Sequence, residues 1–206
     1  MNLAAELFSP AWLWGASVLA ALVAVWVIRT GPWSSLRDSL RLNLFLGWGV
    51  MLAVVWSMNA GVYPGLNLHL LGAMVVTLVM GPQLAMGSLA IALAAVTFNG
   101  AAEWQAYPIN WLVMGVAPVL VANLHFTLVH RFAPRHFFVF IFVIAFFGSA
   151  LTTMAQGLVA SGVLCAAGAY TCDFLSANYL PYFLLLGFSE AWLSGAAVTL
   201  MVVFRP

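Results

Sequence analysis

Long unbroken apolar runs, separated by short segments rich in Gly and Pro, constrain this chain more than any other feature of its sequence. A helix needs roughly 20 apolar residues to cross a bilayer, so a chain of this length has room for about six to eight crossings. The runs are continuous rather than alternating, which argues against a transmembrane β-barrel. They cover residues 10–28, 42–61, 69–80, 84–98, 110–130, 137–160 and 180–204.

The composition excludes several classes of protein. Only 5% of the 206 residues are charged and 65% are hydrophobic, whereas a soluble domain carries about 25% charged residues. The net charge is +1 and Lys and Arg together number 6, so the chain lacks the basic surface of a nucleic-acid-binding protein. Without a long repeat or a polar linker, residues 1–206 are expected to form a single all-α, multi-pass membrane domain.

The segment 69–98 contains Gly81-Pro82 near its middle, and it is either one kinked span or a hairpin of two short spans. The hairpin gives about seven transmembrane helices and places every arginine on one side of the membrane. The positive-inside rule favours this arrangement. It predicts an N-terminus outside and a C-terminus in the cytoplasm, in a bacterial inner membrane. The arginines are Arg29, Arg37, Arg41, Arg131, Arg135 and Arg205.

Two cysteines, Cys165 and Cys172, fall in an expected outer loop at about residues 161–179. The space outside a bacterial inner membrane is oxidising, so a disulfide is one interpretation. Two free thiols in a loop of small residues are the other, because spacing alone does not establish a bond.

The polar side chains that carry chemistry are few enough to weigh singly. His69 opens the third run at its outer end, and imidazole is the commonest metal ligand among side chains. A lone His at a wet interface is the alternative, since one His is not a site. Met58, Asn59 and Asn110 are expected at the same level of the membrane.

Glu190 lies inside the last run, where an acid is costly and points to a function or to a buried anchor. We expect an anchor with Ser189 or Ser194 as local partners, and bordering the site is a further role. On the first run, Ala16, Ala20 and Ala24 form a stripe of small residues. The stripe predicts close packing within the chain or docking of a partner subunit.

Several catalytic and binding motifs are absent from the sequence. It contains no P-loop, nucleophile elbow, HExxH or CxxC, so we expect no enzyme. If transport uses ATP, another polypeptide hydrolyses it. His125 and His130 are five residues apart and do not share a helix face. The 9 Met residues could supply thioether ligands along a path for Cu(I) or, more simply, fill gaps between packed helices.

A set of short motifs spread along the chain resembles the CbiM/NikM family, the substrate-binding membrane subunits of energy-coupling-factor cobalt and nickel importers. The motifs are Met58-Asn59, Pro64-Gly65, the His69-Leu70-Leu71-Gly72-Ala73 segment, Gly81-Pro82 and Asn110-x-x-x-Met114-Gly115-Val116. The resemblance implies seven helices and a metal site at the outer face. It implies that the N-terminal amine, a His at position 2 and a His matching His69 bind the metal. Here Asn2 stands in place of that second-position His.

Two hypotheses from different classes follow. The first is a substrate-capture subunit of an energy-coupling-factor-like importer, which takes up a divalent or monovalent transition metal ion and works with a transmembrane coupling subunit and separate ATPases. The second is a non-transporting accessory subunit of a larger membrane complex that kept the fold and lost the site. An importer of an organic ligand is a third, weaker alternative. In the first hypothesis the ligands and pocket residues are Met1, Asn2, Met58, Asn59, His69 and Asn110.

Overall fold

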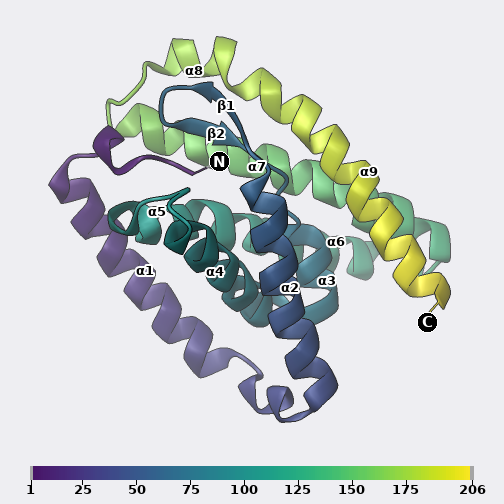
Figure 1. Cartoon of the computed structure of the whole chain (residues 1–206). Helices are drawn as coiled ribbons and strands as arrows, with labels where there is room; N and C mark the ends of the chain where they lie inside the picture. The colour runs from purple at the N-terminus through teal and green to yellow at the C-terminus, as the bar shows by residue number, and fades with distance from the viewer. Residues whose placement is uncertain (1, 205–206) are drawn as a thin grey trace.

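The computed structural model describes residues 2–204, and helices make up most of it (Figure 1). The helices are α1 (Pro10–Thr30), α2 (Ser39–Ser57), α3 (Ala73–Met80), α4 (Pro82–Phe98), α5 (Tyr107–Trp111), α6 (Ala117–Phe132), α7 (Gly148–Ala166), α8 (Cys172–Asn178) and α9 (Leu180–Phe204). Short 3-10 turns are η1 (Ala5–Leu7), η2 (Trp33–Arg37) and η3 (Trp104–Ala106). The π-helical stretches η4 (Leu112–Val116) and η5 (Val139–Phe147) lead into α6 and α7.

Within the described residues, five helical segments are long and apolar enough to cross a bilayer. They are Pro10–Thr30, Ser39–Ser57, Trp104–Phe132, Val139–Ala166 and Leu180–Phe204. Pro10 and Pro82 sit in the first turns of α1 and α4, where the missing N–H costs no hydrogen bond. The chain is therefore a multi-pass membrane protein with little mass outside the helices.

The chain reverses direction between α3 and α4. The Ser88 hydroxyl of α4 donates to the Phe45 carbonyl of α2 over 3.2 Å, and Ile91 lies against Gly49 farther along both helices. Both residue numbers rise together, so α2 and α4 run parallel, and α3 between them runs the opposite way. Gly81, with φ of 79°, makes the turn. The chain therefore reverses at Gly81 instead of continuing as one kinked helix, but α3 has 8 residues and neither α3 nor α4 is among the five described segments long enough to cross a bilayer.

Two predicted helix boundaries were wrong. The run 42–61 ends as a helix at Ser57, and a β-hairpin follows, with β1 (Ala60–Tyr63) paired antiparallel to β2 (Leu66–Leu68). The helix expected to start at His69 starts at Ala73, so His69 lies in a short extended segment before it. The reason is that Gly72 is left-handed, with φ of 72°, and the amides before the helix bond to a side chain of α9.

The packing of α7 against α9 is close because glycines face the neighbouring helix. Gly157 lies under the ring of Phe183, and Gly187 lies against Ala150. The residue numbers run in opposite senses, so the two helices are antiparallel. Figure 1 shows α9 crossing over α7, with the β-hairpin beside the start of α9.

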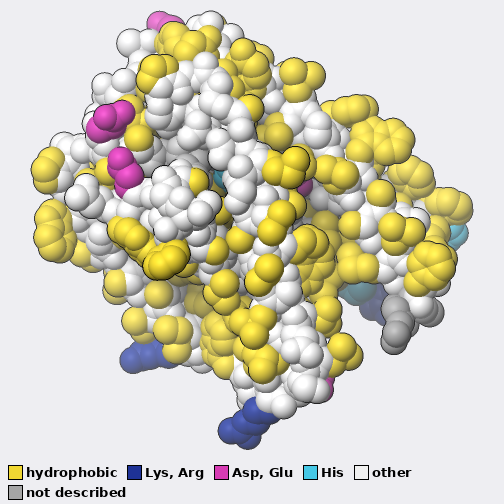
Figure 2. All heavy atoms as spheres, viewed as in Figure 1, with side chains coloured by type: hydrophobic (Ala, Val, Ile, Leu, Met, Phe, Trp, Pro, Cys, Tyr) yellow, Lys and Arg dark blue, Asp and Glu magenta, His cyan; other side chains and the backbone are white. Residues whose placement is uncertain are grey.

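Most basic and acidic side chains lie toward opposite ends of the molecule, although Asp38 caps α2 directly after Arg37 and Glu190 is buried. Figure 2 shows the described basic side chains at the end remote from the β-hairpin, and acidic side chains near the hairpin end. Arg29 ends α1, Arg37 lies in η2 and Arg131 lies in the last turn of α6. Arg205 lies outside the described residues.

Candidate functional site

The segment before α1 is held in the bundle by backbone hydrogen bonds. The Leu3 N–H donates to Asn110 Oδ1 over 2.8 Å, and Asn110 Nδ2 donates back to the Leu3 carbonyl over 3.0 Å. Leu3 also pairs with Leu66 of β2, and the Ala5 N–H donates to Glu103 Oε2 over 2.7 Å. Asn110 is fully buried. It therefore fixes the path of the N-terminal segment, and both polar atoms of its side chain are engaged.

Asn2 is delivered by this segment to a small polar cavity. Its Nδ2 donates to the Ala101 carbonyl over 3.2 Å, while its Oδ1 is buried without a hydrogen-bond partner. The cavity has a volume of about 160 Å³. Asn2, Asn67 of the hairpin and Glu103 are among the residues that line it. An amide oxygen that is buried with a free lone pair is costly unless something binds it.

His69 comes directly after the last residue of β2 and is buried. Its Nδ1 lies 2.9 Å from the Leu70 carbonyl. Because a carbonyl only accepts, Nδ1 carries the proton and Nε2 carries the lone pair. Nε2 is buried and has no partner among the described residues. Burial lowers the pKa of His69 well below its ordinary value, so the ring is neutral at pH 7.

The Trp56 ring and the backbone that follows His69 also fix the position of the His69 ring. The Trp56 ring lies against it, with 4.9 Å between the centroids. Trp56 Nε1 donates to the Leu71 carbonyl, and Glu190 accepts from the amides of Leu71 and Gly72. Glu190 is buried in α9, and Ser194 also donates to it. The last helix therefore anchors the turn two residues beyond His69.

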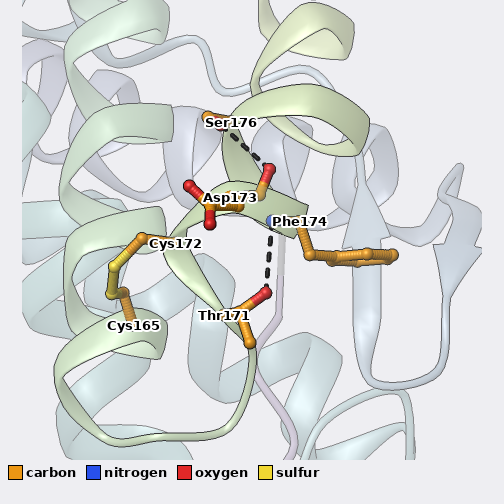
Figure 3. Close-up of a disulfide and its surroundings, with 6 residues drawn as sticks. All are labelled: Cys165, Thr171, Cys172, Asp173, Phe174 and Ser176. Atoms are coloured by element: carbon orange, nitrogen blue, oxygen red, sulfur yellow. Dashed lines mark hydrogen bonds between the residues drawn. A yellow bond between two sulfur atoms is a disulfide. The ribbon is translucent and has the colours of Figure 1, made fainter.

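The loop between α7 and α8, together with the start of α8, packs against the β-hairpin. The Tyr170 hydroxyl donates to the Pro64 carbonyl over 2.7 Å, and the Phe174 ring contacts Tyr63 with 5.0 Å between centroids. Figure 3 shows Cys165 and Cys172 joined in a disulfide at the base of this loop, beside the Thr171 cap of α8. The loop is thus closed on itself and packs on the hairpin that leads to His69.

Other predicted site residues are not in this buried group. Met58 is 78% exposed, and Asn59 is exposed and bonds only to the Ser57 carbonyl. Met58, expected as a possible further ligand, and Asn59, expected to shape the pocket, follow the end of α2 at Ser57 and are not buried with His69. Met1 lies outside the described residues.

The alanine stripe of α1 faces the bundle of its own chain. Ala20 is buried, and Ala16 and Ala24 are half-buried against the core. Ala16 lines a lateral groove of about 590 Å³, and Ala20 and Ala24 line a second one of about 340 Å³. The stripe therefore brings α1 close to α4 and α5 and leaves two shallow grooves beside it.

Two supports of the site were missed by reasoning from the sequence. Trp56 was not singled out, although it lies one helical turn before the end of an apolar run, where an aromatic ring reaches the interface. The clasp by Tyr170 had no signal in the sequence, because its partner Pro64 is 106 residues away.

Two buried acceptors lack a hydrogen-bond partner among the described residues, Nε2 of His69 and Oδ1 of Asn2, and His69 is not among the residues that line the cavity of Asn2. Among the described residues, no group of three or more His, Cys, Asp and Glu side chains could hold a metal ion. Imidazole suits cobalt, nickel and related ions, whereas an amide oxygen is a poorer donor for them. The described residues therefore include one side chain suited to such an ion, His69, and no complete set of ligands.

Comparisons with known proteins bear on this arrangement. The model of the CbiM family, described as the cobalt uptake substrate-specific transmembrane region, matches residues 2–206. A crystal structure of a truncated transition metal transporter has a TM-score of 0.86 at 16% identity, with 100% of both chains covered. A crystal structure of a transition metal transporter has a TM-score of 0.87 at 16% identity, with 99% of this chain and 93% of the other covered. At this identity the likeness shows the fold. No curated protein matches.

Proposed function

We propose a function from the premise that this chain belongs to the CbiM family, whose model covers residues 2–206. The protein is the substrate-capture subunit of an importer that takes up a divalent transition metal ion, with cobalt or nickel as the leading candidates. The metal is the transported substrate and binds at the end of the bundle that carries the β-hairpin. The protein is not an enzyme.

The observation that carries this proposal is the state of His69. A histidine that binds a metal usually donates its other ring N–H to a carbonyl or carboxylate, which fixes the tautomer and the orientation of the ring. His69 has this arrangement, with Nδ1 on the Leu70 carbonyl and a buried, unpartnered Nε2. A neutral ring needs no proton release before it binds a cation. The same ring is braced by Trp56 and by the turn that Glu190 holds.

Further ligands come from the N-terminal segment. The Oδ1 of Asn2 is a free oxygen donor, and the amine of Met1 is the nitrogen that the family resemblance assigns to the metal. Exposed acids at the same end, among them Glu103, give the entrance a negative charge that attracts cations. We expect Asn2 to make the site weaker and less selective than one with a second imidazole.

Energy for uptake comes from partner subunits in this proposal. The sequence contains no phosphate-binding loop, so a transmembrane coupling subunit with separate ATPases supplies the driving force. The arginine-rich end faces the cytoplasm of a bacterium by the positive-inside rule, and the hairpin end faces outward. A coupling subunit that docks on the alanine stripe of α1 would have to enter the two grooves beside it.

A second candidate function rests on Asn2. Its Nδ2 already bonds to the Ala101 carbonyl, so the side chain has a structural role that needs no metal. A subunit that kept this fold, lost high-affinity capture and stabilises a larger membrane complex is consistent with that contact. Co-purification with a respiratory or metalloenzyme complex, rather than with an ATPase, would favour it.

The test is metal content and affinity of the full chain purified in detergent. Elemental mass spectrometry is expected to find cobalt or nickel near one ion per chain after loading, and calorimetry with each ion gives the affinity. The variant His69→Ala is expected to lose binding. Asn2→His is expected to tighten it, because imidazole replaces an amide oxygen.

The matched control is His130→Ala, which removes an exposed histidine of α6 from the basic end of the molecule. Its metal binding should equal that of the unaltered protein. If the folded, unaltered protein binds no first-row metal, capture is refuted and the accessory function takes its place. If His69→Ala binds as well as the unaltered protein, the site lies elsewhere.

A further inference from the structure

A second cavity opens at the other end of the molecule, between the end of α6 and the start of η5. Its volume is about 370 Å³. One part of its wall is apolar, with Phe126, Phe140 and Val202 among the residues that form it. The other part carries His130, Arg135 and His136. The cavity is remote from His69 and has no role in metal capture.

The polar part of this wall is wholly basic or neutral. The 5 acidic side chains all lie within the described residues, and none of them lines the cavity. The His136 Nδ1 accepts from the Phe138 N–H over 3.2 Å, so the proton of the neutral ring is on Nε2, a donor. The His130 ring stacks on Phe126 with 5.5 Å between centroids. Arg135 adds a permanent positive charge.

The position of the cavity decides between kinds of anion. It lies in the short connection between two segments that are long enough to span a bilayer, Trp104–Phe132 and Val139–Ala166. Arg135 and His136 are in that connection and His130 is in the last turn of α6, whereas the apolar part of the wall comes from α6, η5 and α9. A free phosphate ion would use only the basic part. A phospholipid uses both parts, with its phosphate at the rim and its acyl chains on the wall.

We propose that this cavity is a binding site for one anionic phospholipid, with its headgroup phosphate at Arg135, His130 and His136. Bound there, the lipid ties α6 to η5 at the arginine-rich end. Zwitterionic lipids bind less well, because their headgroup brings no net negative charge to the rim.

The experiment is native mass spectrometry of the full chain, with phosphatidylglycerol or phosphatidylcholine of the same acyl chains added to the detergent. We expect a saturable adduct of one phosphatidylglycerol, several-fold tighter than that of phosphatidylcholine. Arg135→Ala should weaken it about fivefold, the value of one basic side chain near an anionic headgroup. Ala133→Trp, which fills the cavity from its lining, should abolish it.

Arg37→Ala is the matched control, because Arg37 lies in η2, in the connection between α1 and α2, and does not line the cavity. It should leave the adduct unchanged, and gel filtration checks that every variant is folded. Equal binding of the two lipids, or equal loss in Arg37→Ala and Arg135→Ala, would overturn the proposal. Full displacement by inorganic phosphate, with Ala133→Trp still binding, would assign the rim to a free anion. Absence of any lipid adduct would also overturn the proposal.

Discussion

Removal of the carboxylate of Glu190 tests the link between the last helix and the site. Its oxygens accept from the amides of Leu71 and Gly72, which lie 119 and 118 residues away in the sequence. The variant Glu190→Ala leaves the buried N–H of Leu71 and the partly buried N–H of Gly72 with no acceptor. An unsatisfied buried donor costs about 1–3 kcal/mol and a partly buried one costs less, so the two predict a loss of about 2–4 kcal/mol in the free energy of unfolding. Glu190→Gln keeps one acceptor oxygen and should cost about 1 kcal/mol.

The assay is thermal unfolding of the full chain in detergent, followed by metal titration of the folded variants. For a chain of this size about 2–4 °C of melting temperature corresponds to 1 kcal/mol, so Glu190→Ala should melt at least about 5 °C lower. Its metal affinity should also fall, because the turn after His69 loses its anchor. Ser189→Ala is the control, since Ser189 is exposed and bonds only to the Leu185 carbonyl of its own helix. A Glu190→Ala protein that melts with the unaltered protein would refute the reasoning.

Three further predictions concern the supports of the site. Asn110→Ala removes two hydrogen bonds to the Leu3 backbone and should cost about 2–4 kcal/mol; hydrogen exchange at residues 2–8 should rise, and unchanged exchange would contradict this. Gly157→Ala places a methyl group into the Phe183 ring and should lower the free energy of unfolding by about 1–3 kcal/mol. The methyl group of Gly162→Ala meets no neighbouring atom, so this variant should be more stable by about 0.5–1 kcal/mol. Thermal unfolding measures both changes. Reduction of Cys165–Cys172 should raise hydrogen exchange in the α7–α8 loop and in the hairpin it clasps, and an effect confined to the loop would show that the clasp is independent of the bond.

The helices could be predicted because their signals are local, whereas the reversal at Gly81 was favoured over a kinked span by the positions of the arginines along the whole chain. Apolar runs, Pro in a first turn and Gly at a turn each act over a few residues. The β-hairpin at residues 60–68 could not be predicted in this way. Val62, Leu66 and Leu68 continue the apolar character of the preceding run, so the turn residues Pro64-Gly65 did not separate two strands from a loop after a helix, and the pairing of Leu66 with Leu3 joins residues far apart in the sequence.

The same distinction applies to the candidate site, where residues could be chosen from the sequence but the contacts of their side chains could not be predicted. His69 was a candidate because an imidazole in an apolar chain is rare, and Asn110 because it opens a helix in a pattern that resembles a family. What these side chains bond to depends on contacts across about a hundred residues, such as Asn110 to Leu3 and Glu190 to Leu71. The exposure of Met58 has a local cause, since α2 ends at Ser57, earlier than the apolar run, and Met58 comes directly after it.

Asn2 is positioned by the N-terminal segment that carries it, which is held in place through its backbone. Leu3, Ala5 and their partners Asn110, Glu103 and Leu66 place the segment by bonds to its backbone. None of these bonds depends on the side chain of residue 2, so His and Asn would be carried to the same cavity. A change of residue at position 2 therefore alters affinity, and among the bonds that hold the segment it removes only the one from Asn2 to the Ala101 carbonyl. The sharpest consequence is that Asn2→His should change metal affinity while the melting temperature of the metal-free protein stays within about 2 °C, a shift worth roughly 1 kcal/mol at this chain length.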